Sequence, residues 1–582
     1  MDSVREIDRR SFMTYFSSIG LGGTLLPGVL WASVAEGTEI TVASIAAAEE
    51  VAGLKFDDAE RTMMLDGLKQ QEQRIENLHK VPIANSVSPA LVFNPVPVGM
   101  TVPRDAKREM VRGKIVARPT PSNLEDLAFL PVTELSDLIR RRRVTPTQLT
   151  QMYLARIKRY DPVLKCVVTL MEDRAMAQAR AADAEIARGR YRGPLHGIPW
   201  GAKDLLAVRG YKTTWGAGPF RNQVIDDDAT VVQRLDAAGA ILVAKLTLGE
   251  LAQGDVWFGG MTKNPWKLDQ GSSGSSAGPA SATAAGLMGF TIGSETLGSI
   301  SSPSTRCGTT GLRPTFGRIP KSGAMALSWS MDKLGPICRS VEDCALVLDA
   351  IHGPDGKDLS AIPASFNWNA TLDPLRLRVG YVKSAFDLPL TDPKDDKRTL
   401  HASKKFDDAA LAVMKSLRIP LIPVTLPDLP YDAMRIILTA EAAAAFDDLT
   451  RSNRDSELVQ QGRNDWANTF RTARFIPAVD YINANRLRST AIAAWHELMK
   501  TVDVIVTPTS AADLSQLVAT NLTGHPAVIL PNGFRDDGTP VSLTFIGGLF
   551  EEAKLMAVAH AYQSATGFHR RHPPMTLNPA PG

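Results

Sequence analysis

The stretch GSSGSSAGPASATAAGLMGFTIGSETLGSISSPSTRCG spans Gly271–Gly308 and decides the fold of this chain. Glycine, serine, threonine and alanine dominate it, and its only charged side chains are Glu295 and Arg306. A disordered Gly/Ser linker would not contain the apolar run Leu287–Ile292. Small residues at this density let backbones approach closely and direct hydroxyls and N–H groups into a site. The composition therefore favours a functional site over a purely structural loop.

Four motifs in and around this stretch resemble those of the amidase signature family, the Ser-Ser-Lys amide hydrolases. The family pattern is a GGSSGGSA-like loop, an alanine-rich helix, GTDTGGSI and then GxxGxKPT. This chain has GSSAG at Gly274–Gly278, GSETLGSI at Gly293–Ile300 and GTTGLRPT at Gly308–Thr315. Upstream, GIPWGAKD at Gly197–Asp204 matches the family's GIPxxxKD. Each motif alone is a weak signal, but together and in the family order they make the resemblance specific.

The resemblance implies the roles of three side chains. Ser299 corresponds to the attacking serine, Ser275 to the serine that relays its proton and Lys203 to the final base. The two serines are 24 residues apart, which is the family spacing. The resemblance also implies a cis peptide bond between Gly274 and Ser275. The oxyanion is expected to bind the backbone N–H groups of the following four residues: Thr296, Leu297, Gly298 and Ser299.

Lys203 can act as a base only in its neutral form. The ordinary pKa of a lysine is about 10.4, and burial away from carboxylates lowers it by up to about 3–5 units. An ion pair with Asp204 or Glu295 would stabilise the charged form and oppose the mechanism. We therefore expect Lys203 to be desolvated and unpaired.

Two positions depart from the family pattern. Leu297 replaces the first glycine of the common TGGS, and it would be strained if the loop needs a positive φ at that position. Ser301 stands where many members have an arginine that can bind a substrate carboxylate. Its presence disfavours small acidic amides and weakens an assignment as the glutamine-handling component of an amidotransferase.

Two other side chains fit alternative nucleophile patterns. Ser276 is the central serine of a GxSxG string, which in an α/β-hydrolase would follow a strand and use a distant histidine. The preceding residues do not have a strand pattern, and no histidine stands out as a partner. Cys307 lies just past Ser299, but a buried free cysteine usually only packs. We expect neither residue to be the nucleophile.

Length and composition describe an ordinary globular protein. The chain has 582 residues, of which 44% are apolar and 22% charged, and a net charge of +3 gives no case for nucleic acid. Four cysteines without a CxxC pair and few histidines argue against a metal site, and we expect no cofactor. Strands alternating with helices indicate an α/β fold. The resemblance implies the amidase signature fold, with a central mixed β-sheet flanked by helices on both faces, over residues 121–572.

The N-terminus carries a candidate export signal over residues 1–35. Twin arginines, Arg9 and Arg10, precede an uncharged stretch from Ser11 to Ala35 that resembles a Tat signal, and Ser33–Ala35 is a candidate cleavage site. We expect a periplasmic or secreted protein without stable membrane insertion after processing. A retained anchor and a helix of a cytoplasmic protein remain the alternatives.

Residues 36–120 are expected to form an N-terminal extension. Asp57 or Asp58 is a candidate cap for a helix over Ala59–Lys80, and Pro82–Pro103, hereafter the strap, has the proline-rich pattern of an extended segment. The strap is read as structural packing, with a lid over the substrate entrance as the functional alternative. Residues 573–582 are expected to be a tail.

Local patterns predict the scaffold of the catalytic domain. A helix is expected to begin after Thr145 and to end at Pro162, and Asp332–Ile351 is expected to be a loop followed by a helix. Trp257, Phe258 and the region 366–482 are expected to supply pocket walls. Strand patterns occur at Cys166–Leu170, Gly239–Leu246, Leu377–Val382, Val502–Thr507, Asn521–Pro531 and Val541–Gly547.

The sequence thus predicts a serine amidohydrolase that cleaves a small neutral or apolar carboxamide through an acyl-enzyme. An esterase or carbamate hydrolase with the same three residues remains an alternative, because the same nucleophile cleaves easier carbonyls. A glutamine-amidase subunit of an amidotransferase complex and a non-catalytic binding homologue are the others. The sequence leaves open whether the chain forms a homodimer.

Overall fold

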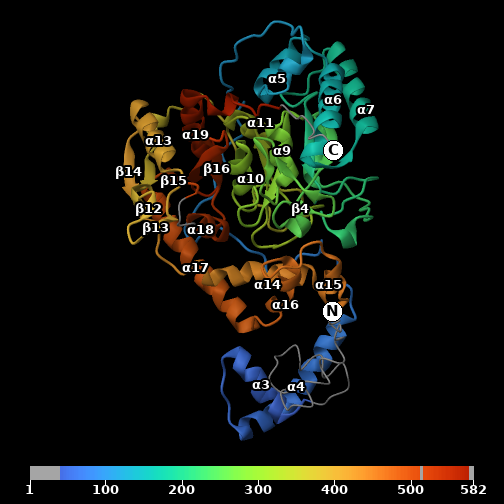
Figure 1. Cartoon of the computed structure of the whole chain (residues 1–582), viewed down its shortest axis with the longest axis vertical. Coiled ribbons are helices and arrows are strands. Elements are labelled where there is room, and N and C mark those ends of the chain that lie inside the picture. The colour runs from blue at the N-terminus through green and yellow to red at the C-terminus, as the bar shows by residue number, and fades with distance from the viewer. Residues whose placement is uncertain (1–39, 511–514, 576–582) are drawn as a thin grey trace, which may run out of the picture.

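A mixed sheet of eleven strands forms the centre of the molecule in the computed structural model, which describes residues 40–510 and 515–575 (Figure 1). The predicted signal peptide lies outside the described residues. Pairing is antiparallel through the middle of the sheet and parallel for β3–β2–β8 and for β15–β11–β14. In spatial order the strands are β1 (Val167–Leu170), β3 (Ile241–Leu246), β2 (Pro199–Lys203), β8 (Phe290–Glu295), β10 (Lys333–Cys338), β9 (Thr310–Arg313), β16 (Ala527–Phe534), β17 (Pro540–Gly547), β15 (Val504–Pro508), β11 (Val379–Val382) and β14 (Leu421–Val424).

Helices cover both faces of this sheet. Along β8, Phe290 and Ile292 point into the largest apolar core, which also contains residues of α5 and α11. The alternate residue Thr291 bonds Thr283 of α9, so α9 lies on the other face. The helices of the catalytic domain are α5 (Val132–Arg140), α6 (Pro146–Leu164), α7 (Glu172–Ala187), α8 (Thr230–Ala237), α9 (Ala277–Ala284), α10 (Ser301–Cys307), α11 (Val341–Ile351), α12 (Lys383–Asp387), α13 (Lys404–Ser416), α14 (Ile436–Ala445), α15 (Asp447–Arg451), α16 (Trp466–Ala473), α17 (Ala478–Thr501), α18 (Ser515–Thr523) and α19 (Glu552–Thr566).

Most predicted strands are confirmed, and three local predictions are wrong. Helix α6 starts after the Thr145 cap but continues through Pro162, because a proline in the last turn removes only one N–H. The segment that we expected to be a loop contains β10, in which Pro336 pairs with β8 alone. Asn521 belongs to α18, and the strand that follows begins at Ala527.

The N-terminal extension begins with two helices, α3 (Val42–Ala52) and α4 (Asp58–His79), which lie apart from the sheet in Figure 1. Asp57 caps α4 as predicted, and its side chain accepts a hydrogen bond from the Glu60 N–H. The strap then runs back to the catalytic domain without a helix or strand. None of the helices in the described part of the chain is long and apolar enough to cross a membrane.

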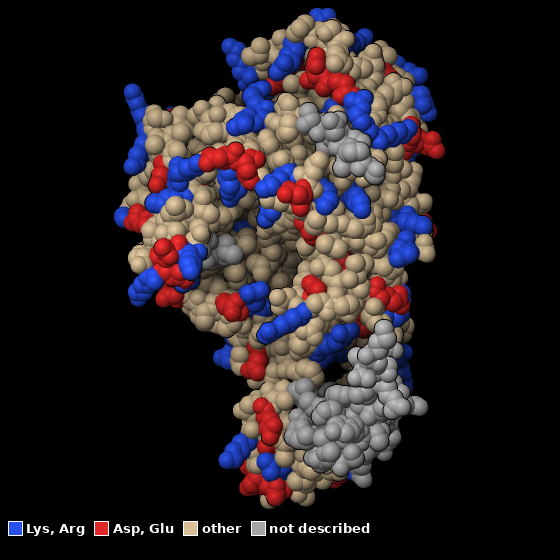
Figure 2. All heavy atoms as spheres, in the orientation of Figure 1, with Lys and Arg blue, Asp and Glu red and all other residues tan. Residues whose placement is uncertain are grey.

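Charges of both signs are mixed over the face that Figure 2 shows, and its centre is hollowed. The four cysteines, Cys166, Cys307, Cys338 and Cys344, are free and buried.

Candidate active site

The loop between β7 (Lys267–Gly271) and α9 contains a cis peptide bond between Gly274 and Ser275. A Cβ atom on Gly274 would lie 1.7 Å from the Gly254 carbonyl oxygen, so only glycine fits there. The preceding N–H of Ser273 donates to the Asp255 carboxylate at 2.7 Å. The loop is therefore held at Gly274 and just before it, and Ser275 lies against Lys203 at the end of β2.

Lys203, the last residue of β2, is fully buried at the centre of a group of serines. Its Nζ lies 2.8 Å from Ser275 Oγ, 3.1 Å from Ser276 Oγ and 2.9 Å from Ser294 Oγ. Burial lowers the pKa of Lys203 to about 7, against a smaller opposing effect of Asp332 and Glu295. Lys203 therefore releases its proton in the neutral pH range.

The aspartate that follows Lys203 is paired elsewhere. The Asp204 carboxylate lies 2.8 Å from Nζ of Lys245, and it accepts hydrogen bonds from the Thr214 N–H at 2.9 Å and the Thr214 hydroxyl at 2.5 Å. Lys245 is also fully buried, in β3. The expected absence of an ion pair between Lys203 and Asp204 is confirmed.

Glu295, at the end of β8, is likewise held by other groups. Its carboxylate lies 2.9 Å from the Arg313 guanidinium and accepts the N–H groups of Ile300 and Ser301 at 2.9 and 2.8 Å. Although burial alone would raise the pKa of Glu295, Arg313, Asn521 and these N–H groups lower it to about 2. Glu295 is thus ionised and fixes the turn that leads into α10.

The turn between β8 and α10 carries the predicted oxyanion loop. The positive φ of this turn falls on Gly298, at +89°, and not on Leu297, so the strain considered for Leu297 does not arise. The Thr296 hydroxyl donates to Asp332 at 2.5 Å. Within the described residues, the N–H groups of residues 296–299 have no hydrogen-bond acceptor. These four amides are therefore available to an external oxygen atom.

Ser299 lies at this turn and is 8% exposed. Its carbonyl oxygen accepts the Ser276 N–H at 3.1 Å, which brings the turn against the Ser275 loop. Among the described residues, no hydrogen bond joins the hydroxyls of Ser275 and Ser299. The structure thus brings Lys203 and Ser275 into direct contact and places Ser299 beside them.

Two further serines complete the surroundings of Lys203. Ser276 is fully buried, and its hydroxyl donates to the Ser294 carbonyl oxygen at 3.0 Å and accepts the Ser294 N–H at 3.1 Å. This burial contradicts a nucleophilic role for Ser276. Ser294 was not predicted, because its contact with Lys203 depends on the parallel pairing of β2 with β8.

Burial also raises the pKa of Cys307, which argues against a thiolate there.

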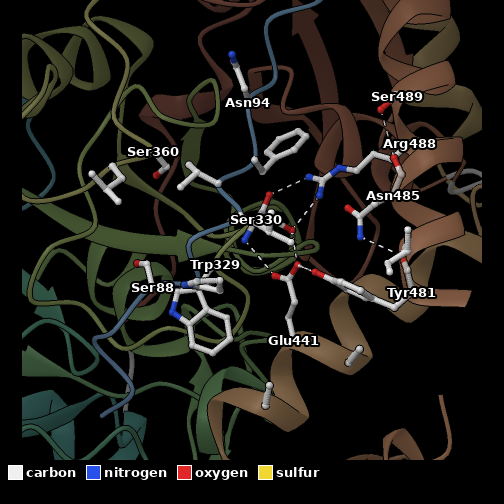
Figure 3. A pocket seen from close by; sticks show the side chains of 18 of the residues that line it. Ser88, Asn94, Trp329, Ser330, Ser360, Glu441, Tyr481, Asn485, Arg488 and Ser489 are labelled. Carbon is white, nitrogen blue, oxygen red and sulfur yellow. Dashed lines mark hydrogen bonds between the residues drawn. The ribbon is translucent and has the colours of Figure 1, made fainter. Parts of the chain in front are cut away.

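A cavity of about 720 Å³ lies between the strap, α14 and α17 (Figure 3). A second, narrower cavity shares Ser88, Lys321 and Trp329 with it and extends to Ser294 and Thr296, beside Lys203 and the oxyanion loop. The region 366–482 thus supplies part of the wall, as expected. Trp257 and Phe258 line neither of these two cavities and pack edge to face on each other.

Comparisons with known proteins agree on one family. A family model described as Amidase matches residues 148–518. A Methylococcus capsulatus protein, named as one of the subunits of glutamyl-tRNA(Gln) amidotransferase, is 34% identical over 479 residues, covering 76% of this chain and 98% of that protein. The solved structure of native peptide amidase from Stenotrophomonas maltophilia is 30% identical with a TM-score of 0.66, covering 78% of this chain and all of that one. The structure of 6-aminohexanoate cyclic dimer hydrolase, 22% identical with a TM-score of 0.65, has the same fold.

Proposed function

Because this chain belongs to the amidase signature family and is a hydrolase of amide bonds, we propose that Ser299 is its nucleophile and that Ser275 and Lys203 take up the serine proton. The observation that carries the proposal is the contact of 2.8 Å between Lys203 Nζ and Ser275 Oγ at a fully buried lysine. The pKa of Lys203, about 7, lets this nitrogen accept a proton in the neutral pH range.

The hydrogen bonds of Lys203 suit a neutral amine. A neutral amine has two N–H groups and one lone pair. The hydroxyls of Ser276 and Ser294 are positioned to accept the two N–H groups. The lone pair is then left for the Ser275 hydroxyl, whose proton it can accept. Ser275 in turn can accept the proton of Ser299 as that residue attacks.

In the proposed reaction the Ser299 oxygen bonds to the amide carbon, and its proton passes through Ser275 to Lys203. The negative oxygen that forms is bound by the free amides of residues 296–299. The carbon–nitrogen bond then breaks, and the leaving amine takes the proton back through Ser275. Water attacks the acyl group by the same proton path, which releases the acid and restores Ser299.

Ser301, which stands where many family members have an arginine, supports a neutral amide as the substrate. Its N–H and hydroxyl both donate to Glu295, at 2.8 Å each, so this position offers no cation for a substrate carboxylate. A glutamine amide would need its own carboxylate to be bound elsewhere. We therefore favour a neutral or apolar carboxamide over glutamine, the substrate that the resemblance to the amidotransferase component suggests.

Covalent labelling tests the nucleophile. Wild-type protein treated with an alkyl fluorophosphonate should gain one adduct by intact mass, and Ser299→Ala should gain none. Because neutral Lys203 is required, the labelling rate should rise about tenfold per pH unit below pH 7 and level off above it. An adduct that survives in Ser299→Ala would refute the assignment. Release of acid and amine by the wild type, and not by Ser299→Ala, would complete the test.

We also propose export through a Tat signal, which rests on the twin arginines and the small-residue site at Ser33–Ala35. The mass of protein made with its own N-terminus should then be that of a chain that begins near residue 36. A full-length chain in the cytoplasm would contradict this proposal.

A further inference from the structure

We propose that the strap forms one wall of the substrate channel and that this wall selects amides with an extended apolar group. The inference rests on the proposed function. The strap precedes the region that the Amidase family model matches, residues 148–518, so this wall is an addition to the matched domain. It lines both cavities, with Asn85, Ser86 and Ser88 next to the site and Leu91 and Val92 farther out.

Two anchors hold the strap in place. The Asn85 side chain accepts the Ala326 N–H at 2.8 Å and donates to the Ala326 carbonyl oxygen at 2.8 Å, as a neighbouring strand would. At the other end, the guanidinium of Arg488 lies 3.4 Å from the centre of the Phe93 ring, and Phe93 also packs edge to face on Phe316. The strap between these anchors is therefore a fixed wall of the cavity.

The buried charged groups of the cavity, Glu441 and Arg488, are bonded to neighbouring protein groups (Figure 3). Glu441 accepts hydrogen bonds from the hydroxyls of Ser328, Ser330 and Tyr481 at 2.6, 2.7 and 2.9 Å, and from the Ser330 N–H at 3.0 Å. Arg488 donates to the Ser330 hydroxyl and carbonyl oxygen at 2.9 and 2.8 Å. A charged ligand group beside Glu441 or Arg488 would have to break these contacts. Arg486, the other arginine of the lining, is exposed to solvent and donates to Asn483 at 3.0 Å. The interior of the cavity therefore does not favour a charged ligand.

Lys321, which lines both cavities, is paired as well. Its Nζ donates to the Ser360 hydroxyl at 2.6 Å, lies 3.6 Å from the Asp358 carboxylate and lies 4.3 Å from the centre of the Phe316 ring. Lys321 at the junction of the two cavities is therefore not an unpaired cation that could bind a substrate carboxylate.

Part of the remaining wall is apolar and exposed. Leu91 is 88% exposed, Leu359 75% and Ile482 56%, and all three line the larger cavity. Exposed apolar side chains that gather around a hollow mark a binding site. Because this hollow shares Ser88, Lys321, Trp329 and Asp358 with the cavity that reaches Ser294 and Thr296, its occupant is expected to be the apolar part of the amide that is cleaved there.

Equilibrium binding to Ser299→Ala tests the inference without turnover. Calorimetric titration with butanamide and octanamide should show at least about tenfold tighter binding of octanamide, since each methylene that leaves water adds about fourfold. Leu91→Asp in the same background should weaken octanamide at least about fivefold and change butanamide less than about twofold. Val98→Asp is the matched control, because Val98 belongs to the strap, is fully exposed and does not line the cavity.

Equal affinity for the two amides, no binding of either, or an octanamide affinity that Leu91→Asp does not change would overturn the inference. A change of oligomeric state in Leu91→Asp, seen by sedimentation, would also overturn it, because the wall would then be a contact between two copies of the chain. If instead the proposed function is wrong, the wild-type protein will release no ammonia from either amide.

Discussion

The free energy of unfolding of Lys203→Met, relative to that of the wild type, should be greatest at neutral pH and should fall as the pH rises. In the unfolded chain a lysine keeps its proton up to about pH 10.5, whereas folded Lys203 releases it above about pH 7. Between these values, unfolding takes up one proton. The free energy of unfolding of the wild type therefore rises with pH in this window because of Lys203, and Lys203→Met lacks that contribution.

The magnitude follows from the two pKa values. Each pH unit in the window changes the free energy of unfolding by about 1.4 kcal/mol. The cost of holding Lys203 in the folded protein is therefore about 5 kcal/mol below pH 7 and vanishes above about pH 10.5. From pH 7 to pH 9 the wild type should gain about 2 kcal/mol relative to Lys203→Met, because the slope reaches its full value only above the folded pKa. Loss of the hydrogen bonds to Ser275, Ser276 and Ser294 shifts the whole difference by a constant and does not change its slope.

Urea unfolding at pH 7, 8 and 9 measures this slope. Lys397→Met is the matched control for replacing a lysine by methionine, because Lys397 is exposed and lies outside the site. A difference between wild type and Lys203→Met that is independent of pH would refute the reasoning. It would mean that folded Lys203 keeps its proton and that Ser275 does not have a neutral amine beside it.

Two further substitutions test the loops that hold the site. Gly274→Ala should lower the rate of fluorophosphonate labelling at least about a hundredfold, because the added Cβ meets the Gly254 carbonyl oxygen. Gly67→Ala on α4 is the control and should label normally, because no atom lies within 4 Å of the added Cβ. Equal labelling of the two variants would show that the loop does not need its close approach. Glu295→Gln should lower the free energy of unfolding by about 3–5 kcal/mol at pH 7, because Arg313 then lacks its buried partner. A loss below about 1 kcal/mol in urea unfolding would show that Arg313 is satisfied without the Glu295 carboxylate.

The contact between Lys203 and Ser275 could be predicted only through the resemblance to the amidase signature family, because the two residues lie 72 positions apart and no local pattern brings them together. The requirement for a neutral base also gave two physical expectations, burial of Lys203 and no ion pair with Asp204 or Glu295, and both are confirmed. These expectations followed from the chemistry of a lysine base, once the resemblance had assigned that role to Lys203.

The partners of those carboxylates could not be predicted in this way. Lys245 reaches Asp204 because β2 and β3 pair in parallel with Ala202 opposite Lys245, and a run such as GAILVAKL carries no sign of that register. For the strap we expected structural packing and not a cavity wall, because proline-rich extended segments pack in many ways. Pairing register and docking of extended chain are set by tertiary contacts, which local patterns do not encode.

Three carboxylates lie near Lys203 in the chain or in space, and the fold gives each of them a different set of donors. Asp204 has Lys245 and Thr214, Glu295 has Arg313 and the amides at the start of α10, and Asp332 accepts from Thr296 and from the N–H groups of residues 327 and 328. Two of these donor sets also position the oxyanion loop, through Glu295 before it and Asp332 beside it. The contacts that give Glu295 and Asp332 partners other than Lys203 are therefore the same contacts that hold the amides of residues 296–299 in place. A substitution that released either carboxylate would affect both the basicity of Lys203 and the binding of the oxyanion.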